Sequence, residues 1–351
     1  MKYSHILIFI AVVFALGWLL MPGIEQPAAC PLTFEQQKPL KKNALLTEVF
    51  FKARDGKDLF YRFVSHHQAG DLIILLHGSS YHGTYLLPLA EALAEHNDIC
   101  IPDIRGHGKS SPPAGTCSYL GQLEDDLSDL INQLPKKYSH ITLIGHSSGG
   151  GLAIRFAAGP HKNMVQQLIL LTPAIVTAPT MNTPGAYAWA HVHKITLAEL
   201  AALNALGITR FNTQPILTLN KPKELCDGSE TLVYDYNLAV SLHPRIPYKK
   251  DCGIATPKIH ILVGEFDEIN NPQAFDKIFP PERITILKNV SLQREICIVH
   301  ALFRRLQIQP YGLLLHVWPW HFESFGFASC EYWFCKNSIA ARICYLFLCR
   351  E

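Results

Sequence analysis

The sequence predicts an α/β fold, a doubly wound and mostly parallel sheet that carries a helical insertion. Three observations lead to this prediction. Short runs of Ile, Leu and Val recur along residues 71–287, and such continuous runs are typical of strands buried on both faces. Segments with helical periodicity separate the runs, and strands that alternate with helices pair in parallel. The chain of 351 residues is 48% apolar, which is enough for the core of one large domain.

The first element is a predicted β-hairpin at residues 47–65, where apolar and polar residues alternate on both sides of the turn signal Arg54-Asp55-Gly56. The predicted strands that follow are the apolar runs DLIILLH (71–77), DICIPD (98–103), HITLIGH (140–146), QQLILLTP (166–173), KIHILVGE (258–265) and RITILKNV (283–290). The predicted helices are TYLLPLAEALAEH (84–96), SYLGQLEDDLSDLINQL (118–134), GGGLAIRFAAG (149–159) and PQAFDKIF (272–279). Together these elements define one domain at residues 45–291.

A segment at residues 174–255 interrupts this alternation. It is rich in Ala, Pro, His and Tyr, and it contains helical runs such as KITLAELAALNALG (194–207). An insertion of this size after a strand has the length to cover the carboxyl edge of the sheet. We therefore expect a helical lid, which shapes a substrate pocket and excludes water from it.

The N-terminal run Ile6–Ile24 is uncharged, apolar and long enough to cross a membrane. Lys2 precedes it, and this flank predicts a cytoplasmic N-terminus and an exported domain, periplasmic or extracellular. We favour a transmembrane anchor or signal segment at residues 1–24 that stays uncleaved, followed by a linker at residues 25–44.

Two processed forms of this segment stay open as alternatives. A cleaved signal peptide fits the small residues after the run, although Pro27 occupies a position where a small residue is favoured. A lipoprotein processed at Cys30 is the other. A buried core helix fits less well because the run has no polar face.

Composition excludes some partners. The formal charge of +2 arises from 31 basic and 29 acidic residues, so there is no electrostatic case for a nucleic acid or a polyanionic substrate. Ten cysteines fit an exported protein, and Cys226 and Cys252 both belong to the insertion, so we expect a disulfide between them that bridges the lid. No cysteine shows the spacing of a metal ligand, so we expect no metal site.

The strongest motif is Gly145-His146-Ser147-Ser148-Gly149, which follows a predicted strand and opens a predicted helix. This is G-x-S-x-G in its strand-turn-helix context, where a tight turn lifts the serine hydroxyl out of the sheet edge. The helix N-terminus directs unpaired N–H groups at negative charge formed there. A serine in a glycine-rich turn is often only a turn residue, but this context predicts that Ser147 is a nucleophile.

A second motif, His77-Gly78-Ser79, ends an earlier predicted strand. The backbone N–H groups of Ser79 and Ser148 are predicted to form an oxyanion hole, each donor contributing about 3 kcal/mol in the transition state. A plain turn is the alternative. We interpret the nearby DIRGHG loop (103–108) as structural, close to the pocket but not reactive.

The segments HGSS, DIRGHGKS, GHSSGG and LVGEFDE together resemble the α/β-hydrolase superfamily. The chain is most similar to serine hydrolases of the monoacylglycerol lipase and lysophospholipase group, with a serine aminopeptidase S33-type domain, over about residues 45–291. The resemblance implies hydrolysis of small or lipid-like carboxylic esters through an acyl-enzyme on Ser147, with no cofactor. Thioesterases and peptidases share this fold, so amide or thioester cleavage is an alternative.

The resemblance also implies an acid and a histidine, in that order after the serine. Asp267 follows the predicted strand at 258–265 and fits the position of the acid, which orients and stabilises the histidine. Glu265 and Glu268 are neighbouring residues that could supply the acid instead. The non-catalytic alternative is that Asp267 only caps the next helix. Leu292 stands where the histidine is expected, and the first histidine downstream is His300.

The tail at residues 292–351 differs from the rest of the chain. It has no aspartate, five of the ten cysteines and three of the five tryptophans. An appended module or an interfacial segment is one hypothesis for it. A reading-frame shift near codon 291 is another, and it also explains the missing histidine. The alternative to a serine hydrolase is therefore an inactive remnant, or a binding module, that lacks its base.

Overall fold

The structure, a computed structural model, describes residues 46–65, 70–94, 97–135, 137–176, 178, 189–254 and 258–290. These residues belong to one compact unit. The predicted N-terminal anchor and linker, and the predictions for Leu292, His300 and the tail, lie outside them. Within the part that is described, no helix has both the length and the apolar character needed to cross a bilayer.

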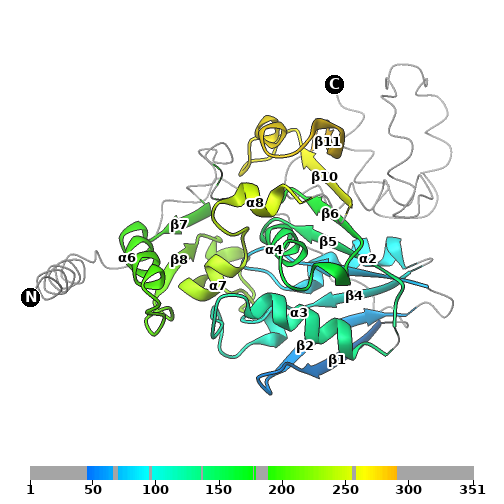
Figure 1. The fold of residues 1–351 in the computed structure, drawn as a ribbon. Helices are drawn as coiled ribbons and strands as arrows, with labels where there is room; N and C mark the ends of the chain where they lie inside the picture. The colour runs from blue at the N-terminus through cyan, green and yellow to red at the C-terminus, as the bar shows by residue number, and fades with distance from the viewer. Residues whose placement is uncertain are drawn as a thin grey trace, which may run out of the picture. The chain divides into compact units, whose positions relative to one another are not determined.

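An eight-stranded sheet forms the centre of the fold, in the order β1-β2-β4-β3-β5-β6-β10-β11 (Figure 1). Its strands are β1 (Leu46–Lys52), β2 (Asp58–Val64), β3 (Asp71–Leu76), β4 (Asp98–Pro102), β5 (His140–His146), β6 (Gln167–Leu171), β10 (Lys258–Gly264) and β11 (Ile284–Leu287). β1 and β2 pair antiparallel as the predicted hairpin, β2 pairs antiparallel with β4, and the remaining pairs are parallel. The mostly parallel α/β sheet is thus confirmed.

The helices that flank this sheet are α2 (Leu87–Leu93), α3 (Gln122–Gln133) and α4 (Ser148–Ala157). α3 buries Leu123, Leu127 and Leu130 against the sheet, and Glu124 and Asp125 in its first turn match the positive end of its dipole. α3 and α4 lie side by side over the central strands (Figure 1). Short 3₁₀ turns complete this part: η1 (Gly83–Leu86), η2 (Gly108–Ser110), η3 (Lys162–Met164), η5 (Pro272–Lys277) and η6 (Pro281–Arg283).

The segment between β6 and β10 is mixed rather than helical, which corrects the prediction. It contains an antiparallel sheet of β7 (Ala190–Val192), β8 (Pro215–Leu219) and β9 (Val233–Asp235), together with α6 (Lys194–Ala205), α7 (Tyr236–Ser241), α8 (Tyr248–Cys252) and the 3₁₀ turn η4 (Lys223–Leu225). β7 and β9 have three residues each, so they are too short to show a period of two in the sequence.

The predicted disulfide between Cys226 and Cys252 is wrong, because both thiols are free. Cys252 ends α8 and is buried in the core, where burial raises the pKa of its thiol to about 12. The Cys226 thiol instead donates to the carbonyl of Pro222 at 3.4 Å. Among the described residues, His, Cys, Asp and Glu side chains form no group that could hold a metal ion.

Candidate active site

Ser147 lies in the turn between β5 and α4, in a backbone conformation that few residues adopt. Its φ of 51° and ψ of −117° fall outside the usual regions for a residue with a side chain, which costs about 1–3 kcal/mol. Hydrogen bonds maintain this strain: the Ser147 N–H donates to Leu171 O at 2.9 Å, and Ser147 O accepts from the N–H groups of Gly150 and Ala174. The serine is therefore held at the carboxyl end of the sheet.

Two glycines allow this turn to form. A Cβ on Gly145 would lie 2.5 Å from Gly149 O, and a Cβ on Gly149 would lie 2.4 Å from Leu76 O and 2.5 Å from His77 O. Only glycine fits at such distances, because real Cβ atoms do not approach a carbonyl so closely. The start of α4 consequently packs directly on the backbone at the end of β3, which is where the His77-Gly78-Ser79 motif begins.

The predicted oxyanion residues Ser79 and Ser148 are in contact. The Ser79 hydroxyl donates to the Ser148 hydroxyl at 2.9 Å, and a Cβ on neighbouring Gly78 would lie 3.3 Å from the Cβ of Ser147. Neither the Ser79 N–H nor the Ser148 N–H donates a hydrogen bond to another residue that the structure describes. Two amide donors are thus unused beside the serine, one of them in the first turn of a helix.

Asp267 follows β10 in a tight turn and is only 8% exposed. Its Oδ1 accepts from the N–H groups of Ile269 at 2.8 Å and Asn270 at 2.7 Å, and the Thr172 side chain also hydrogen-bonds the carboxyl. Ser147 follows β5, Thr172 follows β6 and Asp267 follows β10. Because these strands are adjacent and parallel, the three residues lie at the same edge of the sheet.

The alternatives to Asp267 are placed differently. Glu265 is exposed, and its carboxylate accepts from the Asn289 N–H at 2.9 Å. Glu268 is half-buried. The cap of the following 3₁₀ turn is Asn271, which accepts from the N–H of Gln273, and Asp267 does not fill that position. Asp267 is therefore the one buried carboxyl of the three.

Burial raises the pKa of Asp267 to about 6 despite its hydrogen bonds, which act in the opposite direction. A raised folded-state pKa gives a contribution to stability that is fully present below the ordinary aspartate pKa of 3.8 and is lost as pH rises through about 6. We therefore expect Asp267→Asn to gain stability relative to wild type between pH 4 and pH 8, by up to about 3 kcal/mol. Urea unfolding across this range measures it, with exposed Asp276→Asn as control. If the difference in the free energy of unfolding between Asp267→Asn and wild type did not change with pH, the raised pKa of Asp267 would be contradicted.

The DIRGHG loop (103–108), which we interpreted as structural, is held by buried ion pairs. Asp103 pairs with buried Arg62 at 2.6 Å and accepts from the Gly83 N–H at 2.8 Å. Arg105 pairs with Asp126 at 2.7 Å and with Asp55 at 2.9 Å. These contacts join the loop to β2, to η1 and to α3, so the loop supports the edge of the sheet from which the His77-Gly78-Ser79 motif projects.

Two tyrosines that hydrogen-bond the residues on either side of Ser79 were not predicted. Tyr85 OH accepts from the Gly78 N–H at 2.6 Å and bonds His146 Nδ1 at 2.9 Å, which joins the two motifs. Tyr234 OH, from the insertion, accepts from the Ser80 N–H at 2.7 Å. Tyr85 has a weak signal in the sequence, since it stands shortly after the HGSS motif. Tyr234 has none, because its partner is 154 positions away along the chain.

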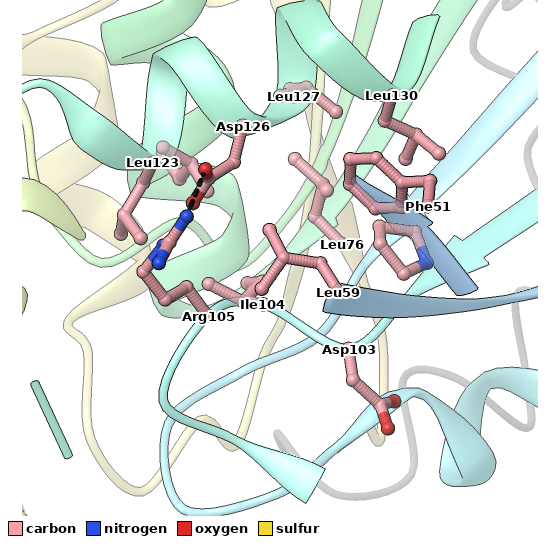
Figure 2. Close-up of a pocket in the computed structure, with 12 residues that line it drawn as sticks. Phe51, Leu59, Leu76, Asp103, Ile104, Arg105, Leu123, Asp126, Leu127 and Leu130 are labelled. Atoms are coloured by element: carbon pink, nitrogen blue, oxygen red, sulfur yellow. Dashed lines mark hydrogen bonds and ion pairs between the residues drawn. The ribbon is translucent and has the colours of Figure 1, made fainter. Parts of the chain in front are cut away.

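A cavity of about 30 Å³ lies elsewhere in the core (Figure 2). Leu residues of the hairpin, of β3 and of α3 line it, together with the Arg105–Asp126 ion pair. Its volume is that of about one water molecule, and none of its lining residues is a candidate site residue. A cavity of this volume is too small to hold an ester substrate.

Comparison with known proteins identifies the family. Residues 67–279 match the family described as "Serine aminopeptidase, S33". An uncharacterized protein of Mycobacterium tuberculosis is 32% identical over 109 residues, which is 31% of each chain. Epoxide hydrolase 4 of Mus musculus is 29% identical over 150 residues, 41% of each chain.

Among solved structures, the fold is similar to that of the alpha/beta hydrolase GrgF from Penicillium sp. sh18. The TM-score is 0.51 at 18% identity, over 75% of this chain and 96% of that one. This likeness concerns the fold alone. The alignments with the curated relatives span less than half of those proteins, 31% and 41% of their lengths.

Proposed function

Because the chain belongs to the serine aminopeptidase S33 family of α/β hydrolases, we propose that it hydrolyses carboxylic esters through an acyl-enzyme on Ser147. One observation carries the proposal. Ser147 is held in a strained turn next to two amide N–H groups, of Ser79 and Ser148, that donate to no other described residue. A nucleophile beside two fixed donors is the arrangement that acyl transfer requires.

In the proposed reaction, a general base takes the proton of the Ser147 hydroxyl while Oγ bonds to the ester carbonyl carbon. The carbonyl oxygen gains the negative charge and accepts from the Ser79 and Ser148 N–H groups. The bond from carbon to the alcohol oxygen then breaks, and the alcohol leaves with the proton that the base returns. Water repeats these steps on the acyl-enzyme, and Asp267 orients the base and stabilises its charged form.

The proposed substrates are lipid-like esters, for which the insertion serves as the lid. Its outer surface supports this proposal. Ile195 and Leu206, at the two ends of α6, are 59% and 64% exposed, and Ile208 and Phe211 follow at 39% and 37%. The face of α6 between its ends presents alanines rather than charges, apart from half-buried Glu199. An apolar surface of this kind favours contact with acyl chains over small polar substrates.

A substrate panel tests the proposal. p-Nitrophenyl acetate, octanoate and laurate would be compared with the matched octanoyl thioester, octanoyl anilide and an alkyl epoxide. We expect kcat/KM to rise from acetate to octanoate, and amide and epoxide turnover to be at least a hundredfold lower. Turnover of the epoxide or the anilide without ester turnover would replace the proposed reaction with another one.

The general base is the remaining member of the proposed triad, and two hypotheses account for it. Either His300 supplies it, or the chain lacks a base and the fold is an inactive remnant. If His300 is the base, His300→Asn should lower kcat by about 10³-fold or more, while His316→Asn, in the same tail, should change it less than twofold. Equal ester turnover in wild type and His300→Asn would exclude His300.

The coding DNA separates the second hypothesis further. A shift of reading frame near codon 291 predicts that another frame encodes a histidine within a few codons and then a stop after one helix. Repairing that frame should then raise ester turnover by several orders of magnitude. If neither of the other two frames encodes such a histidine and stop, His300 stays the candidate for the general base.

A further inference from the structure

We propose that Tyr234 of the insertion is a positioning residue of the oxyanion hole, and that it acts together with Tyr85 to set the direction of the Ser79 N–H. The inference rests on the proposed function. Its central observation is that the amides on either side of Ser79 are both held by a tyrosine hydroxyl. The Gly78 N–H donates to Tyr85 OH at 2.6 Å, and the Ser80 N–H donates to Tyr234 OH at 2.7 Å.

Backbone strain at Ser80 makes the second of these bonds necessary. Ser80 has a φ of 66°, which is the left-handed region that residues with a side chain rarely adopt. Such a conformation persists only where neighbours impose it. The Thr231 N–H donates to Ser80 O at 3.1 Å, so strand β9 and the residues before it hold both backbone polar groups of this residue.

The hydrogen-bond directions are fixed by a neighbouring histidine. His107 Nδ1 faces Arg105 O at 3.2 Å and must therefore donate, while its Nε2 faces Tyr234 OH at 2.7 Å. Burial lowers the pKa of His107 to about 4, so the ring is neutral at pH 7 and Nε2 is an acceptor. The Tyr234 proton consequently points to His107, and the oxygen accepts from the Ser80 N–H and is also in hydrogen-bond contact with the Ser79 side chain.

The segment that carries Tyr234 is fixed to the main domain at several points. The Thr231 hydroxyl donates to Gly106 O at 2.9 Å, the Asp235 N–H donates to Gly115 O at 2.9 Å, and the Asn237 side chain donates to Cys117 O at 3.0 Å. The side chain of Tyr234 is fully buried. This part of the insertion is a scaffold of the oxyanion hole, and any shift of it displaces Ser80.

The chain offers a matched pair of variants. Tyr234→Phe keeps the buried ring and removes only the hydroxyl. Tyr236→Phe removes a hydroxyl from a residue that is also buried, at 6% exposure, and this hydroxyl makes no hydrogen bond to another described residue. Tyr85→Phe removes the corresponding hydroxyl on the other side of Ser79. Circular dichroism would verify that all three variants are folded.

Two readouts test the inference. Amide hydrogen exchange by mass spectrometry measures the peptide that contains Ser79 and Ser80, and we expect Tyr234→Phe to accelerate its exchange about tenfold or more, with Tyr236→Phe changing it less than twofold. The second readout is the rate at which a fluorophosphonate modifies Ser147. We expect Tyr234→Phe and Tyr85→Phe to lower that rate at least tenfold, because a misplaced donor no longer meets the developing oxyanion.

The outcomes are distinguishable. Unchanged exchange in Tyr234→Phe overturns the positioning role, and so does faster exchange with an unchanged rate of modification. An unmodified wild-type protein overturns the proposed function, whatever the exchange shows, and removes the catalytic part of the inference with it. If Tyr236→Phe changed the exchange and the modification rate as much as Tyr234→Phe does, the role of Tyr234 would be packing alone.

Discussion

Ser147→Ala is expected to abolish ester hydrolysis, lowering kcat by about 10³-fold or more, while the protein stays folded. The loss follows because removal of a nucleophile leaves only binding and the oxyanion donors, and the neighbouring Ser148 hydroxyl is bonded to the Ser79 hydroxyl. The fold survives because the Ser147 hydroxyl donates to no other described residue, so its removal leaves no polar group unpaired there.

A second variant at this position checks the structural part of the argument. Ser147→Gly should be equally inactive but more stable than Ser147→Ala by about 1 kcal/mol, because glycine adopts a positive φ without cost. Steady-state hydrolysis of p-nitrophenyl octanoate and urea unfolding measure the two effects. Equal turnover by wild type and Ser147→Ala, after repurification from a strain without esterases, would exclude Ser147 as the nucleophile.

Gly149→Ala is expected to lower the free energy of unfolding by about 3 kcal/mol. Its Cβ would lie 2.4 Å from Leu76 O and 2.5 Å from His77 O, and both are backbone atoms of a buried strand end that no side-chain rotation can move. Either α4 or the end of β3 must shift. That shift separates the Ser79 and Ser148 amides, so ester turnover should fall as well.

Gly70→Ala is the matched control, because a Cβ at Gly70 has nothing within 4 Å. We expect it to change the free energy of unfolding by less than about 0.5 kcal/mol. Urea denaturation of both variants gives the comparison. A Gly149→Ala protein as stable as Gly70→Ala would mean that the helix and the strand end are not in direct contact.

Most of the central sheet could be predicted from the sequence. β3 and β6 are continuous apolar runs, and a strand buried on both faces requires such runs. The strands of the insertion were not predicted, because strands as short as β7 and β9 show no alternation of apolar and polar residues in the sequence. The predicted helix at 272–279 is a 3₁₀ turn, since Pro272 begins a segment of only six residues.

The candidate site was predictable where it depends on local geometry. Ser147 and Ser148 belong to one turn, and Ser79 follows a strand end whose motif is local. Tyr85 and Tyr234 were missed, because a hydroxyl that holds a distant amide is recognisable only after the chain has folded. The Cys226–Cys252 bridge was inferred from compartment and order along the chain, neither of which brings two Cα atoms within the roughly 7 Å that a disulfide requires.

Covalent modification tests the central claim, that Ser147 is an activated nucleophile beside an oxyanion hole, more directly than any rate. The protein would be incubated with a fluorophosphonate and digested with trypsin, and the peptide Tyr138–Arg155 would be fragmented in a mass spectrometer. The account predicts a single adduct, located on Ser147 and absent from Ser147→Ala. No adduct, or an adduct on Ser148 or Ser139 instead, would contradict it.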